Sequence, residues 1–377
     1  MVKVSKLFGV VVLIWISVSL WRSYKNNYIS KQQLMEQLKR KTSFISNKDR
    51  NKIHLNQQIN SNNQDINSTQ KQETFQYVCD KTGTFNGYEK TNRVEDLVIY
   101  SEMPKCGSGT LVDIFQQTAR RATRKHLPTY HTGYTYPVPH EELYQWNKRL
   151  NYANGIFEET PPYLFLGHLR FLDFKEVGHK QPVFIDLVRD PINRTISAYH
   201  YGRKPQFNER ANMTKAETKM SMDECFERLL NETGCVGARD LNKCLHGKKL
   251  TACKSSGIVE RMTTWFSGYG SEVSVNKAKS NIDKYYLIIG VTEYYTESLV
   301  AFGTLIPPVF NMNPTTLVET YKTISNRNVG RNVKQPSAKT KAILRNILSE
   351  EYELYQFILQ RFLKQMKCME IPLRSGK

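Results

Sequence analysis

A short turn that combines a lysine with two glycines could bind an anion. Residues 104–110 read Pro-Lys-Cys-Gly-Ser-Gly-Thr and directly follow an apolar run at 97–100. The pattern predicts a strand, a tight turn and a helix that starts near Ser108. Such a turn directs backbone N–H groups and a helix N-terminus at one point, which suits phosphate or sulfate, and Lys105 adds a mobile cation. The lysine spacing of nucleotide triphosphatases is absent, so an ordinary strand-to-helix turn is the alternative.

A second basic motif follows the apolar run at 183–188. Arg189 ends that run, and Pro191 stands where a helix would begin. Ser197 lies about two helical turns further on, near the same face as the start of that helix. An arginine fork and a hydroxyl can hold a second phosphate.

These motifs require a scaffold that brings them together. Apolar strands are expected at 96–100, 183–188 and 285–290. Helices are expected to begin near Ser108, Ile192 and Glu293, and a long helix is expected over 337–365. This alternation predicts an α/β fold with a parallel sheet flanked by helices. Ligands collect at the carboxyl ends of strands in such sheets, so Lys105 and Arg189 are expected to share one site.

The charge of the chain predicts a polyanionic partner. The 377 residues carry a formal net charge of +19, which suits either nucleic acid or a sulfated or carboxylated glycan. Residues 7–21 form an uncharged apolar run that is short for a plasma-membrane span but suits a thin early-secretory bilayer, which argues against nucleic acid. No small-residue cleavage site follows, so a transmembrane signal anchor is predicted, with a cleaved signal peptide as the alternative.

The remaining organisation follows from composition. Residues 1–6 would form a cytoplasmic tail, and 22–90 are rich in Asn, Gln, Lys and Ser, which predicts a flexible, mostly disordered stem. Residues 91–377 would form the folded lumenal domain of a single-pass type II protein. Asn-x-Ser/Thr sequons predict glycosylation at Asn67, Asn212 and Asn231. A fourth sequon at Asn193 is expected to be empty because it lies in the proposed cofactor helix.

Four cysteines cluster between residues 225 and 253, which is typical of an oxidised lumenal domain. They are Cys225, Cys235, Cys244 and Cys253. Their spacing lacks the close pairs of a zinc site, and it leaves three disulfide connectivities open. No cluster of side chains has metal-ligand spacing, so no metal is expected.

Three further stretches occur in order with the Arg-Asp-Pro-Ile-Asn-Arg motif. They are 163–174, which contains Gly-His-Leu-Arg-Phe-Leu-Asp-Phe, then 286–293 and 350–362. Together they make the region from about 95 to 370 resemble the uronyl 2-O-sulfotransferases, which include the heparan sulfate and the dermatan/chondroitin enzymes. The resemblance implies a P-loop-like sulfotransferase fold and a Golgi membrane location. It also implies 3′-phosphoadenylyl sulfate (PAPS) as sulfate donor and a glycosaminoglycan as acceptor.

The resemblance assigns roles to individual residues. His168 matches the family's base, although a lone histidine among apolar residues is more often structural. A neutral imidazole can take the proton of a sugar hydroxyl, and Lys105 would neutralise charge on the leaving oxygen. The 5′ phosphate would be bound by the loop residues Lys105, Cys106, Gly107, Ser108, Gly109 and Thr110. Arg189 and Ser197 would hold the 3′ phosphate.

Other assignments concern the periphery of the site. Segment 328–336 looks like the family's basic loop over the cofactor, with Arg331 and Lys334 as contacts and a solvated loop as the alternative. Arg203 and Arg210 could contact the glycan, or could be plain surface. The family pattern pairs the clustered cysteines as Cys225–Cys235 and Cys244–Cys253. Cys106 is expected to be a free thiol, while nothing in the sequence supports a Cys79–Cys368 bridge.

One departure from the family concerns substrate choice. Family members carry arginine three positions before the loop lysine, where this chain has Glu102. A carboxylate facing a polyanion would repel it, which favours chondroitin or dermatan over heparan sulfate as acceptor. Two other functions stay open: a Golgi sulfotransferase for another sugar position, and a non-catalytic glycan-binding membrane protein. A homo-oligomer is also left open.

Overall fold

The structure is a computed structural model, and its described residues all lie in one compact unit, Phe75–Lys377. They comprise 78–88, 97–123, 163–177, 181–204, 213–239, 241–245, 261–269, 272–306, 313–324 and 333–373. The predicted tail and anchor and most of the predicted stem lie outside these ranges. Among the described helices, none is both long and apolar enough to span a bilayer.

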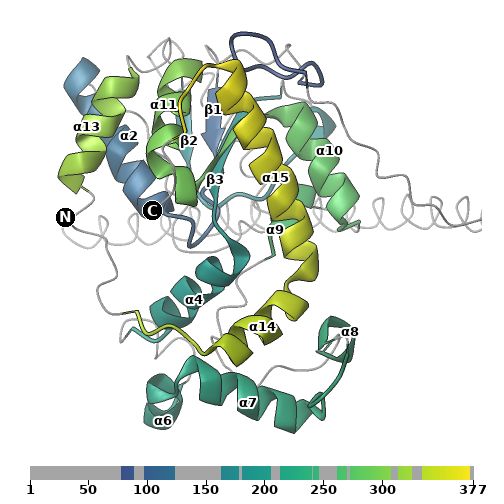
Figure 1. The fold of residues 1–377 in the computed structure, drawn as a ribbon. Helices are drawn as coiled ribbons and strands as arrows, with labels where there is room; N and C mark the ends of the chain where they lie inside the picture. Colours follow the sequence, from purple (N-terminus) through teal and green to yellow (C-terminus); the bar gives the residue numbers. More distant parts are fainter. Residues whose placement is uncertain are drawn as a thin grey trace, which may run out of the picture. The chain divides into compact units, whose positions relative to one another are not determined.

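The centre of the fold is a four-stranded parallel sheet with the strand order β2-β1-β3-β4 (Figure 1). The strands are β1 (Leu97–Tyr100), β2 (Tyr163–Leu166), β3 (Val183–Val188) and β4 (Tyr286–Val291). Every residue of β3 and β4 is buried, as expected for strands that are covered on both faces. The three predicted strands are confirmed to within one residue at each end, whereas β2 was not predicted as a strand.

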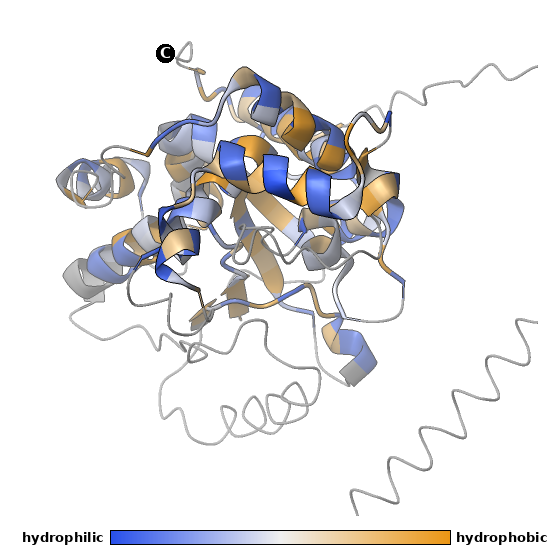
Figure 2. Ribbon diagram, turned by 90° about the horizontal axis from the view of Figure 1, so that it is seen from below, coloured by the Kyte–Doolittle hydropathy of each residue, from blue (hydrophilic) through white to orange (hydrophobic). Residues whose placement is uncertain are grey.

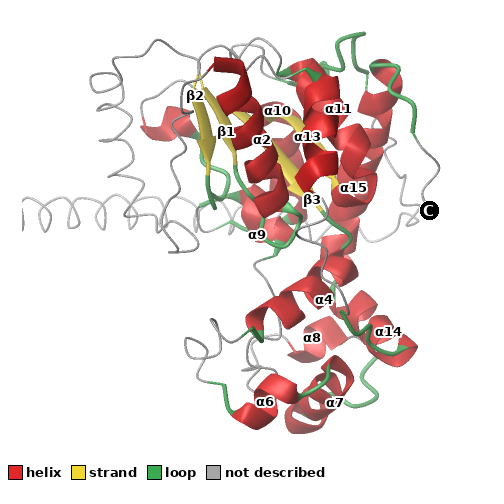
Figure 3. Ribbon diagram, turned by 90° about the vertical axis from the view of Figure 1, so that its left-hand side faces the viewer, coloured by secondary structure: helices red, strands yellow, loops and turns green. Residues whose placement is uncertain are grey.

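Helices pack against the sheet in two groups (Figures 1 and 3). One group contains α2 (Ser108–Thr123), α11 (Tyr295–Leu305) and α13 (Pro314–Ile324). The other contains α9 (Met262–Ser267), α10 (Val275–Tyr285) and α15 (Ser349–Cys368). Short 3-10 turns are η2 (Phe174–Val177) and η3 (Thr292–Tyr294). Figure 2 shows hydrophobic strands enclosed by helices that carry both hydrophobic and hydrophilic residues.

A second, smaller core positions the helix that follows Arg189. It is built from α4 (Pro191–Gly202), α7 (Met222–Thr233), α8 (Leu241–Leu245) and α14 (Ala338–Ile347). The short helix α6 (Lys215–Lys219), which has no buried residue, appears beside them in Figure 3. Ile192 and Ile196 of α4 pack there with Phe226 of α7 and Leu344 of α14. One side of α4 therefore packs in this smaller core and not against the sheet.

The long helix expected over 337–365 is two helices. Leu348 ends α14 and precedes α15, with φ −97° and ψ 22°. The break lets α14 pack in the smaller core, while α15 packs against the sheet and reaches Cys368.

The folded unit begins before residue 91, where the sequence placed the end of the stem. Cys79 forms a disulfide with Cys368 at the end of α15, so the bridge without sequence support is present. Phe85 and Tyr88 are buried, and Gln365 donates to the carbonyl of Gly83 (2.7 Å). Residues 78–88 therefore pack on the folded domain.

The expected pairing of the clustered cysteines is wrong. Cys235 is bonded to Cys244, with 5.9 Å between their Cα atoms. Cys225 lies in the first turn of α7, and Cys235 follows the end of this helix. The helical residues 225–233 alone extend about 12 Å, which is too far for a disulfide between the two cysteines. Gly234 ends α7 in a left-handed conformation (φ 66°), and Cys235 follows this turn. Cys225 is also disulfide-bonded, whereas Cys253 lies outside the described residues.

Candidate active site

The loop between β1 and α2 has an unusual backbone. Glu102, Lys105 and Gly107 all have left-handed conformations, with φ of 51°, 65° and 90°. Glycine is favoured at position 107 for a second reason, because a Cβ there would make a tight contact of 3.1 Å with the ring of Tyr295. The Tyr295 hydroxyl donates to the carbonyl of Gly107 (3.3 Å), and the Thr292 hydroxyl donates to that of Cys106 (2.6 Å). Residues after β4 thus hold the loop in place.

The loop leads into the N-terminus of α2, as the sequence predicted. Leu111 donates to the carbonyl of Gly107, which is the first helical bond after the turn. The N–H groups of a first helical turn have no acceptor within the helix, and they attract anions. The Cys106 thiol is free and buried, and burial raises its pKa to about 12, so it stays protonated. This agrees with the predicted free thiol.

Lys105 lies where several cations converge. Its Nζ is 3.4 Å from the centroid of the Tyr201 ring on α4. Burial, and then the nearby charges of Lys204 and Arg189, lower the pKa of Lys105 to about 8. The charge of Arg189 therefore acts on Lys105, and the expectation that both bind one ligand stays a prediction. A phosphate fits there because it would offset this repulsion.

Arg189 stands between β3 and α4, and Asp190 caps α4 by accepting from the N–H of Asn193 (2.9 Å). Ser197 is half-buried on α4. Asn193 is exposed, so its predicted lack of a glycan stays a prediction. Asn231, also predicted to be glycosylated, is exposed on α7.

A cavity of about 220 Å³ lies beside the C-terminal end of α4. Its lining includes Arg203, predicted to bind glycan, and Lys334, predicted to contact the cofactor. The guanidinium of Arg203 lies 3.3 Å from the ring centroid of Tyr199. Lys334 is exposed, and its carbonyl is 3.0 Å from His200 Nε2. The remaining predicted contacts, Arg210 and Arg331, and the sequons at Asn67 and Asn212 lie outside the described residues.

Sequence reasoning assigned no role to Arg194, although it is the last residue of the Arg-Asp-Pro-Ile-Asn-Arg motif. Its buried side chain donates from Nε to the carbonyl of Pro104 (3.0 Å). Its Nη1 lies 3.6 Å from a carboxylate oxygen of Glu351 on α15. Arg194 therefore connects the anion-binding loop with α4 and α15.

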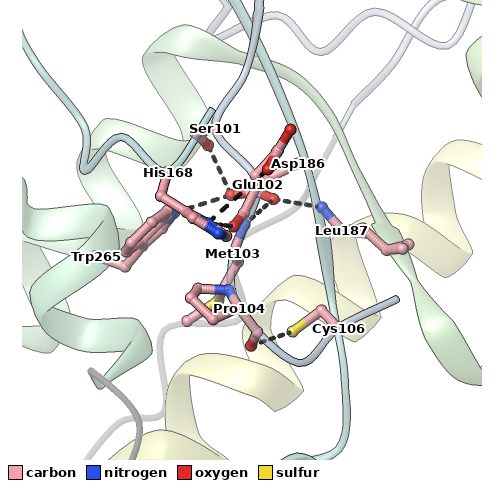
Figure 4. A network of polar contacts seen from close by, with 9 residues as sticks. All are labelled: Ser101, Glu102, Met103, Pro104, Cys106, His168, Asp186, Leu187 and Trp265. Carbon is pink, nitrogen blue, oxygen red and sulfur yellow. Dashed lines mark hydrogen bonds and ion pairs between the residues drawn. The ribbon is translucent and has the colours of Figure 1, made fainter. Parts of the chain in front are cut away.

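Asp186 was also missed, although a charged residue inside the apolar strand β3 could have signalled it. This buried carboxylate accepts four hydrogen bonds (Figure 4). The donors are Ser101 Oγ (2.6 Å), Met103 N (3.1 Å), Leu187 N (2.7 Å) and Trp265 Nε1 (3.0 Å). Burial raises the pKa of Asp186 to about 6 although these bonds favour the charged form. The carboxylate fixes the segment that follows β1 against β3.

His168 follows β2 and faces the same segment (Figure 4). The N–H groups of its neighbours, Gly167 and Leu169, donate to the carbonyls of Tyr100 and Ser101. The ring nitrogen Nδ1 lies 2.7 Å from the carbonyl oxygen of Glu102. A carbonyl can only accept, so Nδ1 carries the hydrogen and Nε2 of the neutral ring is the basic nitrogen. The side chain is 36% exposed, so the ring is accessible to solvent.

Glu102 is buried beside His168, whereas the argument from sequence required its carboxylate to be exposed to the acceptor. The residue is only 5% exposed, and its Oε2 lies 4.0 Å from Nδ1 of His168. Burial, and then the charge of Asp186, raise the pKa of Glu102 to about 7. Glu102 points inward because its two neighbours, Ser101 and Met103, are both hydrogen-bonded to the buried Asp186.

Three adjacent strands thus deliver three functional groups at their carboxyl ends: β2 leads to His168, β1 to Lys105 and β3 to Arg189. The set contains an imidazole that can act as a base, a lysine-bearing loop at a helix N-terminus, and an arginine. Among the described residues, no group of three or more His, Cys, Asp or Glu side chains is arranged to hold a metal ion.

Sequence comparison relates the chain to named sulfotransferases. It is 25% identical over 279 residues to human uronyl 2-sulfotransferase, which covers 70% of this chain and 62% of that protein. It is 24% identical over 292 residues to a Drosophila melanogaster homologue of uronyl 2-sulfotransferase, covering 75% of this chain and 55% of that protein.

The chain has a similar level of identity to a second group of enzymes, the heparan sulfate 2-O-sulfotransferases. Identity to heparan sulfate 2-O-sulfotransferase 1 of Cricetulus griseus is 27% over 275 residues, covering 71% of each chain. No family model matches. The chain spans about three-fifths of the human and mouse uronyl 2-sulfotransferases that it matches. These comparisons confirm the resemblance inferred from the motifs. They do not distinguish the uronyl 2-sulfotransferases from the heparan sulfate 2-O-sulfotransferases as relatives of this chain.

Proposed function

We propose that this chain, a homologue of uronyl 2-sulfotransferases and heparan sulfate 2-O-sulfotransferases, is itself a sulfotransferase. It would transfer a sulfuryl group from PAPS to the 2-hydroxyl of a uronic acid in a glycosaminoglycan. The observation that carries this proposal is the placement of His168, Lys105 and Arg189 at the carboxyl ends of three neighbouring strands.

His168 would act as the general base. The bond from Nδ1–H to the Glu102 carbonyl leaves Nε2 to accept the proton of the sugar hydroxyl. The acceptor oxygen then forms its bond to sulfur, and the bond between sulfur and the leaving oxygen breaks with its electron pair on that oxygen. Lys105 would neutralise the negative charge that develops there.

The donor would be held at both of its phosphate ends. PAPS supplies the sulfuryl group, and its 5′ phosphate fits the left-handed loop and the N-terminus of α2. The side chains of Arg189 and Ser197 would hold the 3′ phosphate, with Arg331 and Lys334 as further contacts. The charges of Lys204 and Arg189 that lower the pKa of Lys105 support this arrangement, because a bound anion would offset them.

The proposed acceptor is a uronic acid in a glycosaminoglycan, without a choice between chondroitin, dermatan and heparan sulfate. A net charge of +19 suits such a polyanion, and Arg203 in the cavity beside α4 is a candidate contact. The preference for chondroitin or dermatan rested on an exposed Glu102. Because Glu102 is buried, that argument does not hold, and heparan sulfate is an equally good candidate.

The proposed location is the Golgi membrane, with the catalytic domain in the lumen. The disulfides Cys79–Cys368 and Cys235–Cys244 support an oxidising compartment. The single span would be the apolar run at 7–21, and Asn231 would carry a glycan on exposed α7.

The proposal is tested by the position of the transferred sulfate. The full chain is incubated with sulfur-labelled PAPS and desulfated chondroitin, dermatan or heparan chains, which are then degraded to disaccharides. Label on the 2-position of uronic acid is expected. Label confined to hexosamine would favour the alternative of another sugar position. Glycan binding without any transfer would favour a non-catalytic glycan-binding protein.

A further inference from the structure

The segment after β1 holds Glu102 in a strained position. The residue has a left-handed backbone (φ 51°), which is unfavourable for a side chain with a Cβ. Its two neighbours are both bound to Asp186: Ser101 donates through its hydroxyl (2.6 Å) and Met103 through its N–H (3.1 Å). The strain is therefore maintained by a buried carboxylate on the adjacent strand.

Glu102 approaches His168 with two different groups. Its carbonyl oxygen accepts from Nδ1 at 2.7 Å, and its carboxylate oxygen Oε2 lies 4.0 Å from the same nitrogen. The other carboxylate oxygen, Oε1, is buried and has no hydrogen-bond partner within the described residues. A buried carboxyl that is only partly satisfied is costly, which points to a role beyond packing.

We propose that Glu102 is a positioning residue for His168: its carbonyl fixes the tautomer of the ring, and its carboxylate stabilises the protonated ring. The effect on catalysis rests on the proposed sulfuryl transfer, whereas the contacts between Glu102 and His168 do not depend on it. When Nε2 takes the acceptor proton, the ring becomes positively charged, and an anion 4.0 Å from Nδ1 favours that state. The carboxylate thus makes His168 a stronger base.

The surrounding groups determine when this anion is present. Burial and Asp186 of β3 raise the pKa of Glu102 to about 7, so its carboxylate forms as the pH rises through neutrality. Tyr100 of β1 is buried nearby, and its pKa is raised in part by Glu102, so it stays neutral. Trp265 of α9 donates to Asp186 and has no charge. Glu102 and His168 are therefore expected to titrate as a coupled pair.

The test varies charge while keeping shape. Glu102→Gln is compared with wild type, and Glu102→Asn with Glu102→Asp, since aspartate and asparagine tolerate left-handed backbone. The pKa of the His168 ring is measured by NMR on the full chain with labelled histidine. The signal is assigned by its loss in His168→Asn. Glu353→Gln, an exposed carboxylate on α15, is the matched control.

We expect the His168 pKa to fall by about half a pH unit or more in Glu102→Gln. It should also be lower in Glu102→Asn than in Glu102→Asp, and unchanged in Glu353→Gln. The Nδ1-protonated tautomer should persist in every variant, because it depends on a main-chain carbonyl. If Glu102→Gln does not fold, the Asp and Asn pair still gives the comparison. Equal His168 pKa values within each folded pair would overturn the proposal.

The kinetic counterpart is the pH profile of kcat/KM. A weaker base loses its proton at lower pH, so the acid limb should move to lower pH in Glu102→Gln, with a plateau about 10-fold lower. A lower plateau with an unmoved limb would indicate a merely structural role and would contradict the proposal. If wild type transfers no sulfuryl group, the proposed function fails, while the NMR comparison still decides the role of Glu102.

Discussion

Lys105 carries a positive charge in surroundings that disfavour it. Burial comes first among the causes that lower its pKa to about 8, followed by the charges of Lys204 and Arg189. The ring of Tyr201 compensates in part through a cation–π contact at 3.4 Å. An anion bound beside Lys105 would favour its charged form, so binding of the donor nucleotide should depend on pH.

Binding of the desulfated nucleotide, adenosine 3′,5′-bisphosphate, should weaken as the pH rises through about 8, because Lys105 then loses its proton and the site loses a cation. Lys105→Arg keeps its charge over this range, so its affinity should decline less. Calorimetric titration of both proteins from about pH 7 to about pH 9.5 measures this difference. Parallel declines would show that Lys105 is not the group responsible.

Arg189 and Lys105 should differ in what their loss impairs. Arg189→Ala should weaken binding of the same nucleotide on the order of 10- to 100-fold, because a charged hydrogen-bonding group is removed. Lys105→Ala should reduce turnover more than affinity, because its charge matters most on the leaving oxygen. Arg228→Ala, which breaks an exposed pair on α7, is the control. Unchanged nucleotide affinity in Arg189→Ala would refute its assignment to the 3′ phosphate.

At the scale of elements, one buried ion pair connects four parts of the fold. Arg194 of α4 bonds to the carbonyl of Pro104 in the loop and pairs with Glu351 of α15. Glu351 also accepts from the N–H groups of Met262 and Thr263 at the start of α9. The loop that would bind the 5′ phosphate is thus held by the helix that follows Arg189.

Arg194→Ala should lower the free energy of unfolding by about 3–5 kcal/mol, because it leaves the Glu351 carboxylate buried without its cation. Denaturant unfolding of the full chain measures the change. Lys279→Ala, which breaks a more exposed pair with Glu353, should cost about 1 kcal/mol or less. A loss in Arg194→Ala no larger than in this control would contradict the proposed role of the pair.

The sequence predicted the elements whose patterns are local and missed those that depend on tertiary contacts. Strands β1, β3 and β4 and the starts of α2 and α4 follow from apolar runs and turn residues. The break at Leu348 is invisible in a helical pattern that continues through it, because packing against two different cores causes it. The inward position of Glu102 likewise depends on Asp186, a residue 84 positions later that only the fold brings close.

At the scale of the whole molecule, disulfides join distant parts of the domain. Cys79 and Cys368 are separated by 289 residues, and their bond ties the segment before β1 to the end of α15. Spacing along the chain could not predict this bond, because only the folded chain brings the two residues together. The Cys235–Cys244 pair, nine residues apart, belongs to one of the three connectivities that the spacing left open.

Non-reducing peptide mapping of the full chain should recover Cys79–Cys368 and Cys235–Cys244. Cys225 should be linked to Cys253, the one cysteine left once Cys106 is counted as a free thiol. Removing the long-range bridge by Cys79→Ser with Cys368→Ser should lower the free energy of unfolding by about 2–5 kcal/mol. Recovery of Cys225–Cys235 instead would contradict the structure.

The central claim is that His168 is the general base of a sulfuryl transfer to a uronic acid. The most direct measurement compares wild type and His168→Ala at saturating PAPS, using the glycosaminoglycan that wild type accepts. Binding of adenosine 3′,5′-bisphosphate is measured on the same preparations. Turnover should fall about 10²- to 10⁴-fold, while nucleotide affinity should stay within about 2-fold. Turnover near the wild-type level in His168→Ala would contradict the claim.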